Sequence, residues 1–350
     1  MEKIIEKAKD IIKEYVDSDD LPGACFAYVT KDNKVYDCYG FKSLVPEKVE
    51  LSVDTIYDIA SLSKVVSTST MVMKLLEEGL IHLDDKVKSI LSEFPYDDVT
   101  VFDLIVHRSG LPADDKDYKK CQNGEELWQF LLNLNKVYET GTKVEYSCFG
   151  YIVLGKIIEH FKGSLEGYAK EVLFDKLESN NIMYNPKEKG RALDCAPTEM
   201  SDQRGLIQGV VHDGKANILN GLAGNAGIFA DIETLSRFVQ MMLNDGVYKD
   251  NVVLNKSSIE MFKKSYTEGL NQSRTMGGWF FGDKTTSSGD RISDCSLYHT
   301  GFTGTSIYID FERECGIILL TNAVHPNREN KMMEIRPRFH NELLDIIDKA

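Results

Sequence analysis

The sequence has no long apolar run. No stretch of its 350 residues approaches the ~20 consecutive apolar residues that span a bilayer. The opening segment, MEKIIEKAKDIIKEYVDSDD, carries charges throughout and so differs from a secretory signal peptide. Its apolar residues recur at helical spacing and predict an amphipathic first helix, at Ile4, Ile5, Ala8, Ile11, Ile12 and Tyr15. We therefore expect a cytoplasmic protein that does not enter a membrane.

Positive charge is also scarce. Lysine and arginine number 41 against 55 aspartates and glutamates, and the formal net charge is −14. An acidic surface repels polyphosphate chains and anionic lipid, so nucleic acids and membrane surfaces are disfavoured as partners. The composition is otherwise that of a globular protein, with 42% hydrophobic residues and no repeat or low-complexity run. A small molecule is the expected partner, and the sequence specifies no oligomeric state.

Features of metal and cofactor sites are missing as well. The seven cysteines are odd in number and none has C-x-x-C spacing, which excludes a zinc ribbon or thioredoxin motif and suits a reducing compartment. His212 has no second histidine three or four residues away, so a structural or capping role is expected for His212 and Asp213. Gly221, Gly224 and Gly227 do not form G-x-G-x-x-G and follow no strand. No cofactor and no metal are predicted.

Hydrophobic periodicity predicts strands at both ends of the chain and helices between them. Strands are expected over 23–30, 34–40, 276–281, 295–300, 306–310 and 315–321. Helices are expected over 61–78, 101–107, 124–134, 150–161, 165–177, 232–243 and 338–347. This order predicts an α+β fold, with one antiparallel sheet flanked by N- and C-terminal helices. Residues 1–57 and 213–350 would form the sheet domain, and residues 58–212 an inserted all-helical domain.

One serine has a lysine placed to activate it. Ser61 is the only serine with lysine three residues later, in the segment Ser61-Leu62-Ser63-Lys64. Positions i and i+3 share a helix face, so the hydroxyl and the amine can touch. A serine hydroxyl needs a base beside it, and a lysine whose pKa is lowered can be that base. The motif alone is weak evidence, because an exposed serine and lysine on a helix would look the same.

Two further segments could reach Ser61. The segment Tyr146-Ser147-Cys148 stands just before the helix expected at 150–161, where a tyrosine can project from a loop. The segment His299-Thr300-Gly301 stands at the end of an expected strand. A strand edge offers a backbone N–H, and a glycine there lets a substrate approach closely.

With these segments the sequence resembles the serine β-lactamases and penicillin-binding proteins, in particular class C β-lactamases, DD-peptidases and related esterases. The S-x-x-K, Y-x-N and K-T-G boxes of that superfamily are matched by SLSK, YSC and HTG, in the same order and at class C-like separations. The likeness runs from about residue 21 to the C-terminus. It includes HRSGLP at 107–112, GLAGNAGIFADIETLSRF at 221–238 and HTGFTGTSIYID at 299–310.

The resemblance implies a role for each matched residue. Ser61 would be the acylated nucleophile, and Lys64 and Tyr146 would share the proton transfers. The backbone N–H groups of Ser61 and Phe302 would form the oxyanion hole, whose donors are each worth about 3 kcal/mol. The residues that meet the substrate would be Cys148, His299, Thr300 and Gly301. The implied activity is that of a serine hydrolase acting on a β-lactam, a D-amino-acid peptide or a small ester.

Two residues depart from the superfamily's pattern. Cys148 stands where the second box has asparagine, and a thiol cannot supply the two N–H donors of an amide. His299 stands where many β-lactamases have lysine. A neutral imidazole attracts a carboxylate less than an ammonium does, and its charge would vary with pH. We therefore expect poor hydrolysis of β-lactams. The class A route to deacylation is also missing, since there is no S-D-N box and Glu166 has no partner asparagine.

Several residues, and the function itself, can be interpreted in a second way. His107 is expected to be architectural rather than catalytic, and Cys148 to be a packed side chain rather than a reactive thiol. Trp279 could form either the wall of the cleft or the core. No G-x-S-x-G elbow is present, so an α/β-hydrolase is disfavoured. The alternative function is a non-catalytic module that binds a D-amino-acid ligand without turnover, although such a module needs no base beside Ser61.

Overall fold

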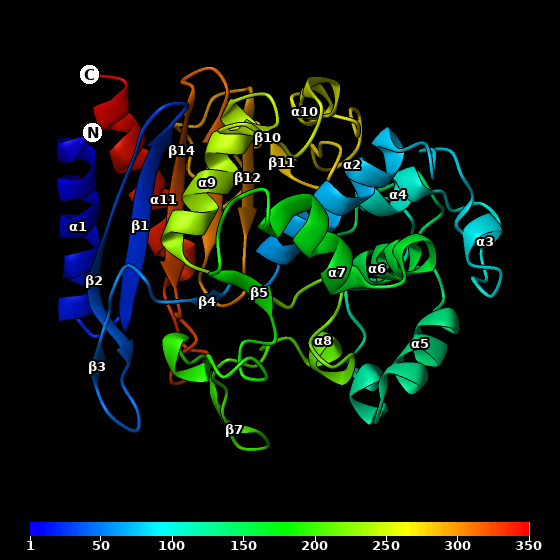
Figure 1. Cartoon of the computed structure of the whole chain (residues 1–350), viewed down its shortest axis with the longest axis horizontal. Helices are drawn as coiled ribbons and strands as arrows, with labels where there is room; N and C mark the ends of the chain where they lie inside the picture. Colours follow the sequence, from blue (N-terminus) through cyan, green and yellow to red (C-terminus); the bar gives the residue numbers. More distant parts are fainter. Residues whose placement is uncertain (350) are drawn as a thin grey trace.

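A seven-stranded antiparallel sheet occupies one end of the molecule and helices the other, in a computed structural model that describes residues 1–349 (Figure 1). The strand order is β11-β12-β13-β14-β1-β2-β3. These strands are β1 (Gly23–Thr30), β2 (Lys34–Ser43), β3 (Val49–Glu50), β11 (Phe280–Phe281), β12 (Ser296–Thr300), β13 (Ser306–Asp310) and β14 (Cys315–Thr321). Both ends of the chain therefore contribute to one sheet, in which β14 pairs with β1.

The inner strand β1, next to β14 at the centre of the sheet, is buried on both faces, which explains its unbroken apolar sequence GACFAYVT. Successive side chains of a strand point to opposite faces. Phe26 belongs to the core cluster under α1 (Glu2–Asp17) and α11 (Met332–Ile347), whereas Val29 belongs to the cluster on the other face. That face is covered by α9 (Ile232–Leu243), which packs on β1 and β14 (Figure 1). The predicted α+β sheet with flanking helices is confirmed.

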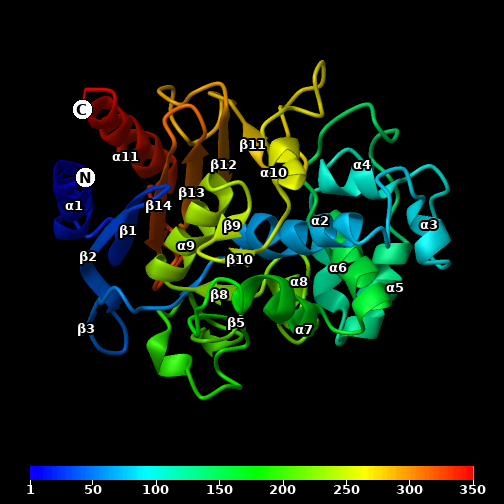
Figure 2. The same ribbon diagram turned by 45° about the horizontal axis from the view of Figure 1, so that its top comes forward.

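The helical part of the chain lies beyond α9, on the side away from the chain ends (Figure 2). Its elements are η1 (Lys64–Thr68, π-helical), α2 (Ser69–Glu77), α3 (Val87–Ile90), α4 (Val101–Ile105), η2 (Lys116–Lys120), α5 (Gly124–Leu132), α6 (Cys148–Lys162), α7 (Leu165–Ala169), η3 (Lys170–Phe174) and α8 (Gly214–Ile218). The short helix η4 (Ala192–Asp194) lies apart from them, beside β2, where Lys42 donates to the carbonyl oxygen of Leu193 at 2.8 Å. Although α8 lies past the boundary expected at residue 212, it packs against α5 and η2. None of the helices in residues 1–349 combines the length and apolar character needed to cross a membrane.

The segment 58–212 is not all-helical, contrary to the prediction. It contains β5 (Ile182–Tyr184) and a hairpin of β6 (Met200–Ser201) and β7 (Gly205–Leu206). The strand β8 (Ile228–Ala230) pairs with both β5 and β4 (Tyr57–Asp58), and so ties this segment to the rest of the chain. Strands of two or three residues are too short to show a period-two pattern. The division into two domains remains a prediction.

Two further predictions differ from the structure. The strand expected over 276–281 is reduced to β11, because Gly277 and Gly278 have φ angles of 93° and 77° and form a turn. The last helix begins at Met332 instead of residue 338, with Pro337 inside it. A proline inside a helix is disfavoured, because it has no backbone N–H to donate. The elements that were not expected include β9 (Val247–Tyr248), β10 (Asn251–Val252) and α10 (Lys256–Phe262).

A glycine contact holds the loop after α8 against α6. A Cβ atom on Gly224 would lie 2.0 Å from the carbonyl oxygen of Tyr151 and 2.9 Å from the backbone nitrogen of Gly155. No side chain fits there unless the backbone moves. The contact matters because the next residue, Asn225, accepts a hydrogen bond from Lys64.

We predict that Gly224→Ala lowers the free energy of unfolding by roughly 2 kcal/mol or more, as overpacked sites do. Gly150→Ala in the same helix α6 is the matched control. Its Cβ would have Leu104 Cδ2 as nearest neighbour at 3.6 Å, an ordinary contact, and alanine favours a helix. Chemical denaturation measures both variants, and equal stabilities would contradict the packing role of Gly224.

Candidate active site

Ser61 and Lys64 are in contact at the start of the helix formed by η1 and α2. The Nζ atom of Lys64 donates to Oγ of Ser61 at 3.2 Å and to the carbonyl oxygen of Asn225 at 2.7 Å. Lys64 is completely buried, whereas Ser61 is half-buried. An ammonium is costly to bury unless acceptors satisfy it, and these two acceptors aim the amine at the hydroxyl. The contact predicted from the S-x-x-K spacing is confirmed.

The residue before Ser61 has an unusual backbone. Ala60 has a φ of 48°, in the left-handed region that residues with a Cβ avoid. The Asp58 carboxylate accepts the backbone N–H of Ala60 at 2.9 Å and that of His212 at 2.7 Å. Thr303 donates its hydroxyl to the carbonyl oxygen of Asp58 at 2.8 Å. These bonds hold a strained turn that presents Ser61 at a helix N-terminus, where unpaired N–H groups favour negative charge.

Tyr146 approaches the pair from the loop before α6. Its ring centroid lies 4.9 Å from Nζ of Lys64, 4.8 Å from the ring of His107 and 5.9 Å from the ring of His299. The hydroxyl oxygen is buried and has no hydrogen-bond partner within residues 1–349. Burial raises the pKa of Tyr146, and the charge of Lys64 opposes that rise. The side chain is therefore a phenol at neutral pH, with Lys64 and Ser61 as its polar neighbours.

His107 holds Tyr146 in place. Its Nδ1 atom accepts the backbone N–H of Ser147 at 3.1 Å, and its carbonyl oxygen accepts that of Glu145 at 2.8 Å. The two residues on either side of Tyr146 are thus both bonded to His107. Burial and the charge of Arg274 hold the pKa of His107 well below its ordinary value, and a neutral ring is what acceptance at Nδ1 requires. The architectural role predicted for His107 is confirmed.

His299 lies at the end of β12, on another side of Tyr146. It is buried, and burial with the charges of Arg274 and Lys64 holds the pKa of His299 well below its ordinary value. Its charge therefore does not vary in the neutral pH range, contrary to the prediction from sequence. Nδ1 lies 3.0 Å from the carbonyl oxygen of Thr300, and Nε2 has no partner in the described part of the chain.

The loop after β12 packs on the strand that precedes Ser61. A Cβ atom on Gly301 would lie 2.5 Å from the carbonyl oxygen of Ile59, so the glycine allows this close packing. Approach of a substrate to Gly301 remains a prediction. The backbone N–H groups of Ser61 and Phe302 have no acceptor within residues 1–349. The side chain of Phe302 is 59% exposed and its ring stacks on His212, with centroids 5.4 Å apart.

Cys148, the first residue of α6, is half-buried and lies near two lysines. Burial lowers the pKa of Lys64, whereas Cys148 and Tyr146 raise it once they are ionised, and the net direction is upward. Lys64 is therefore an ammonium in the resting site. The second lysine, Lys215, is buried and forms an ion pair with Asp114 at 2.6 Å. The packed role predicted for Cys148 remains a prediction.

Sequence reasoning missed two cations of this region, Lys215 and Arg274. Arg274 is fully buried, and its guanidinium carbon lies 5.8 Å from the ring centroid of Tyr146. Neither residue belongs to one of the three boxes, and no local spacing links either to Ser61. Only the tertiary structure brings them to the site.

The remaining sequence candidates have other roles. Trp279 is completely buried and belongs to the core. Asp213 caps α8 by accepting the backbone N–H of Ala216 at 2.8 Å, which confirms the predicted capping. Glu166 forms an ion pair with Lys189 at 2.7 Å. Among residues 1–349, no group of three or more His, Cys, Asp or Glu side chains is arranged to hold a metal ion.

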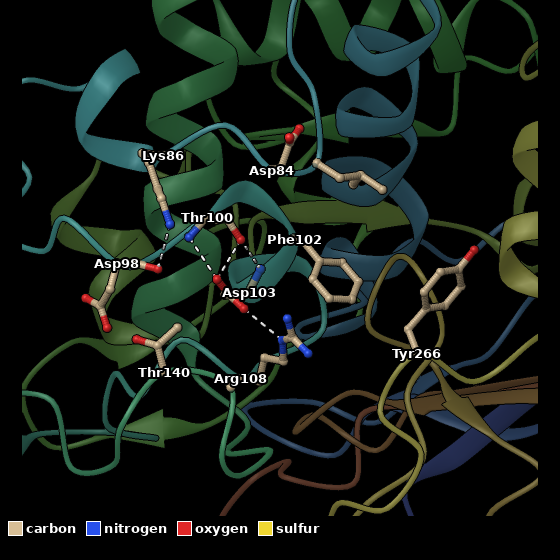
Figure 3. A pocket seen from close by; sticks show the side chains of 11 residues that line it. Asp84, Lys86, Asp98, Thr100, Phe102, Asp103, Arg108, Thr140 and Tyr266 are labelled. Atoms are coloured by element: carbon tan, nitrogen blue, oxygen red, sulfur yellow. Dashed lines mark hydrogen bonds and ion pairs between the residues drawn. The ribbon is translucent and has the colours of Figure 1, made fainter.

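A cavity of about 580 Å³ lies near this site without being part of it (Figure 3). Among its lining residues is Arg108, which forms an ion pair with Asp103 at 2.7 Å. The adjacent residues His107 and Arg108 therefore face different sites. His107 contacts Tyr146, and Arg108 lines the cavity. The cavity lacks a nucleophile beside a base, so the chemistry points to Ser61 instead.

A lysine that touches a serine at a helix start, with a tyrosine beside both, is an arrangement suited to acyl transfer by a serine hydrolase. Residues 8–341 match the family model described as Beta-lactamase. The chain belongs to this β-lactamase family, as the resemblance predicted, and is a serine hydrolase.

Two relatives cover most of the chain. An N-acetylmuramyl-L-alanine amidase of Bacillus subtilis (strain 168) is 29% identical, over 87% of this chain and 78% of the relative. A protein of Escherichia coli (strain K12) named "Putative D-alanyl-D-alanine carboxypeptidase" is 30% identical, over 85% of this chain and 76% of the relative. Both are similar to this chain along nearly its whole length.

Solved structures share the fold at low sequence identity. Simvastatin synthase from Aspergillus terreus superposes with a TM-score of 0.79 at 16% identity and covers 99% of both chains. EstCE1, described as a hydrolase with promiscuous acyltransferase activity, has a TM-score of 0.78 at 16% identity, over 98% of this chain and 99% of its own. At such identities the likeness establishes the fold alone.

Lys64→Ala and Tyr146→Phe are each predicted to slow acylation of Ser61 by about 10²–10⁴-fold, because each removes a positioned acid–base group. Tyr39→Phe makes the same chemical change on strand β2 and is the control for Tyr146→Phe. Stopped-flow acylation rates and thermal unfolding are measured on all variants. Unchanged rates in both site variants would place the base elsewhere.

Proposed function

We propose that this protein cleaves an amide or ester bond through a covalent acyl-enzyme on Ser61, in the manner of class C β-lactamase-like hydrolases. The observation that carries the proposal is the 3.2 Å contact between Nζ of Lys64 and Oγ of Ser61. Oγ attacks the substrate carbonyl carbon while its proton passes to the Lys64–Tyr146 pair. The oxyanion accepts the free N–H groups of Ser61 and Phe302. Collapse expels the amine or alcohol, which takes a proton from the pair, and water then hydrolyses the ester on Ser61.

In the resting site the pair holds one proton too many to act as a base. Burial raises the pKa of Tyr146, and the pKa of Lys64 is raised despite its burial, so phenol and ammonium coexist at neutral pH. One proton must leave before the pair can accept that of Ser61. The reactive fraction therefore grows as the pH rises, and acylation accelerates with pH through the neutral range.

We infer that the substrates are small amides of amino acids. The two relatives support this, because their names describe hydrolysis at N-acetylmuramyl-L-alanine and at D-alanyl-D-alanine. The exposed ring of Phe302 supports it as well. Beside the proposed oxyanion hole it offers a flat apolar surface, and the guanidinium of Arg328 lies 5.6 Å from its centroid. A substrate with an apolar part suits this edge of the site, where the guanidinium of Arg328 is already paired with Glu199 at 2.8 Å.

Small esters are a second candidate substrate. Cys148 offers no amide donors, and His299 is neutral, so two contacts that would select a β-lactam are weakened. A site without those fixed donors discriminates less between acyl groups. An ester also has a better leaving group than an amide and needs less help from the protonated pair.

Labelling of Ser61 tests the acyl-enzyme. Incubation with a fluorophosphonate or a penicillin should give a single adduct, and mass spectrometry of peptides should place it on Ser61. Ser63→Ala, two residues away, should be labelled like the wild type. An adduct on another serine with Ser61 unmodified would refute the mechanism, and a stable adduct without any hydrolysis of p-nitrophenyl acetate would favour the non-catalytic module.

Substrate preference tests the effect of the two departures. We predict that kcat/KM for a cephalosporin is far below that for p-nitrophenyl acetate. Cys148→Asn combined with His299→Lys should raise β-lactam acylation relative to ester hydrolysis, because it restores the amide donors and the cation. A cephalosporin kcat/KM near ~10⁷ M⁻¹s⁻¹ in the unmodified protein would contradict the prediction.

A further inference from the structure

Arg274 is a buried cation without a counter-ion. Only 1% of its surface is exposed. Its guanidinium donates to the carbonyl oxygen of Gly278 at 2.8 Å and to Oε1 of Gln272 at 3.0 Å, and its Nε has no partner within residues 1–349. Both acceptors are neutral. An uncompensated charge in the interior is costly, so a position that keeps one is a candidate for a functional role.

The charge lies beside the Lys64–Tyr146 pair. The guanidinium carbon is 5.8 Å from the ring centroid of Tyr146 and 3.5 Å from that of Phe280, on which it stacks. The titratable and charged groups around the pair come from five elements: Cys148 and Tyr151 on α6, His107 after α4, His299 on β12, Asp213 before α8, and Arg274 before β11. The other cation of this region, Lys215 on α8, is paired with Asp114 at 2.6 Å, whereas Arg274 has no carboxylate partner within residues 1–349.

The third sequence box explains why a cation is needed there. Many β-lactamases have lysine where this chain has His299, which would place a positive charge next to Tyr146. Here the imidazole is 5.9 Å from the Tyr146 ring and is held neutral, so it supplies none. When the pair loses a proton its total charge falls by one, whichever of the two groups gives the proton up. A nearby positive charge favours that loss in either case.

We propose that Arg274 is a positioning residue of the hydrolase: its buried guanidinium charge stabilises the deprotonated Lys64–Tyr146 pair and takes the place of the lysine that His299 replaces. The inference rests on the proposed function of that pair. It adds a residue outside the three boxes on which the reactivity of Ser61 depends.

A purely structural role for Arg274 predicts something different. Stacking on Phe280 and bonding to Gly278 would stabilise the turn before β11 whatever the charge of the pair. Loss of that role lowers stability and slows the reaction equally at every pH. Loss of the charge slows the reaction only where the pair is still protonated, so the pH profile separates the two roles.

Gln272→Glu tests the charge without removing the arginine. The new carboxylate would lie where Oε1 now accepts from Arg274 at 3.0 Å, and it has the size of the amide it replaces. The rate of Ser61 labelling by a fluorophosphonate is measured against pH in this variant, in Arg274→Met and in Arg274→Lys. We expect labelling roughly tenfold slower or more at neutral pH in Gln272→Glu and Arg274→Met, with the difference vanishing at high pH. Arg274→Lys should keep a profile close to that of the wild type.

Two controls complete the experiment. Gln203→Glu makes the same substitution at an exposed position between β6 and β7 and should leave the profile unchanged. His299→Lys added to Arg274→Met should restore labelling at neutral pH, because it returns a cation to the neighbourhood of Tyr146. Profiles of Gln272→Glu and Arg274→Met that run parallel to the wild type at all pH values would overturn the inference. Absence of Ser61 labelling in the wild type would instead overturn the proposed function.

Discussion

The burial of the Lys64 ammonium is the constraint on which the rest of the site depends. A charged amine in the interior must find acceptors, and it finds them in the Ser61 hydroxyl and the carbonyl of Asn225. Asn225 is held in place by the contact of Gly224 with α6. Ser61 is held by the strained turn at Ala60, which Asp58 ties to His212 and Thr303 through hydrogen bonds. Residues 58–64, the loop at Gly224 and Asn225, and helix α6 thus meet around the buried ammonium of Lys64.

The distribution of charge follows from this constraint. Burial, with the charges of Arg274 and Lys64, keeps the nearby imidazoles neutral, and that neutrality lets His107 accept a hydrogen bond and hold Tyr146 in place. The same neutrality leaves His299 without the positive charge of the lysine that many β-lactamases have there. A cation without a carboxylate partner that lies close to Tyr146 is Arg274, buried among neutral partners. Because His299 replaces lysine in the third box, the positive charge beside Tyr146 comes from Arg274, which precedes β11.

Predictions from the sequence succeeded where a pattern was long and regular. The bounds of β1, β13, β14 and α9 agree with the predicted ranges, because β1 and β14 are unbroken apolar runs, β13 is largely apolar and α9 repeats its apolar residues at helical spacing. They failed where an element is short or where glycine and proline interrupt the pattern. The turn at Gly277 and Gly278 shortened β11, and Pro337 hid the first turn of α11. The strands of the segment 58–212 are too short to be seen at all.

The sequence by itself determined the sheet and its flanking helices, the contact of Ser61 with Lys64, and the family, since these rest on local periodicity and on spacing within one helix. The tertiary structure decided the protonation of the site and the neighbours of Tyr146. A pKa depends on burial and on charges a few ångströms away, and those charges come from residues such as Arg274 that are more than a hundred positions distant along the chain. No local pattern records that proximity, because folding alone creates it.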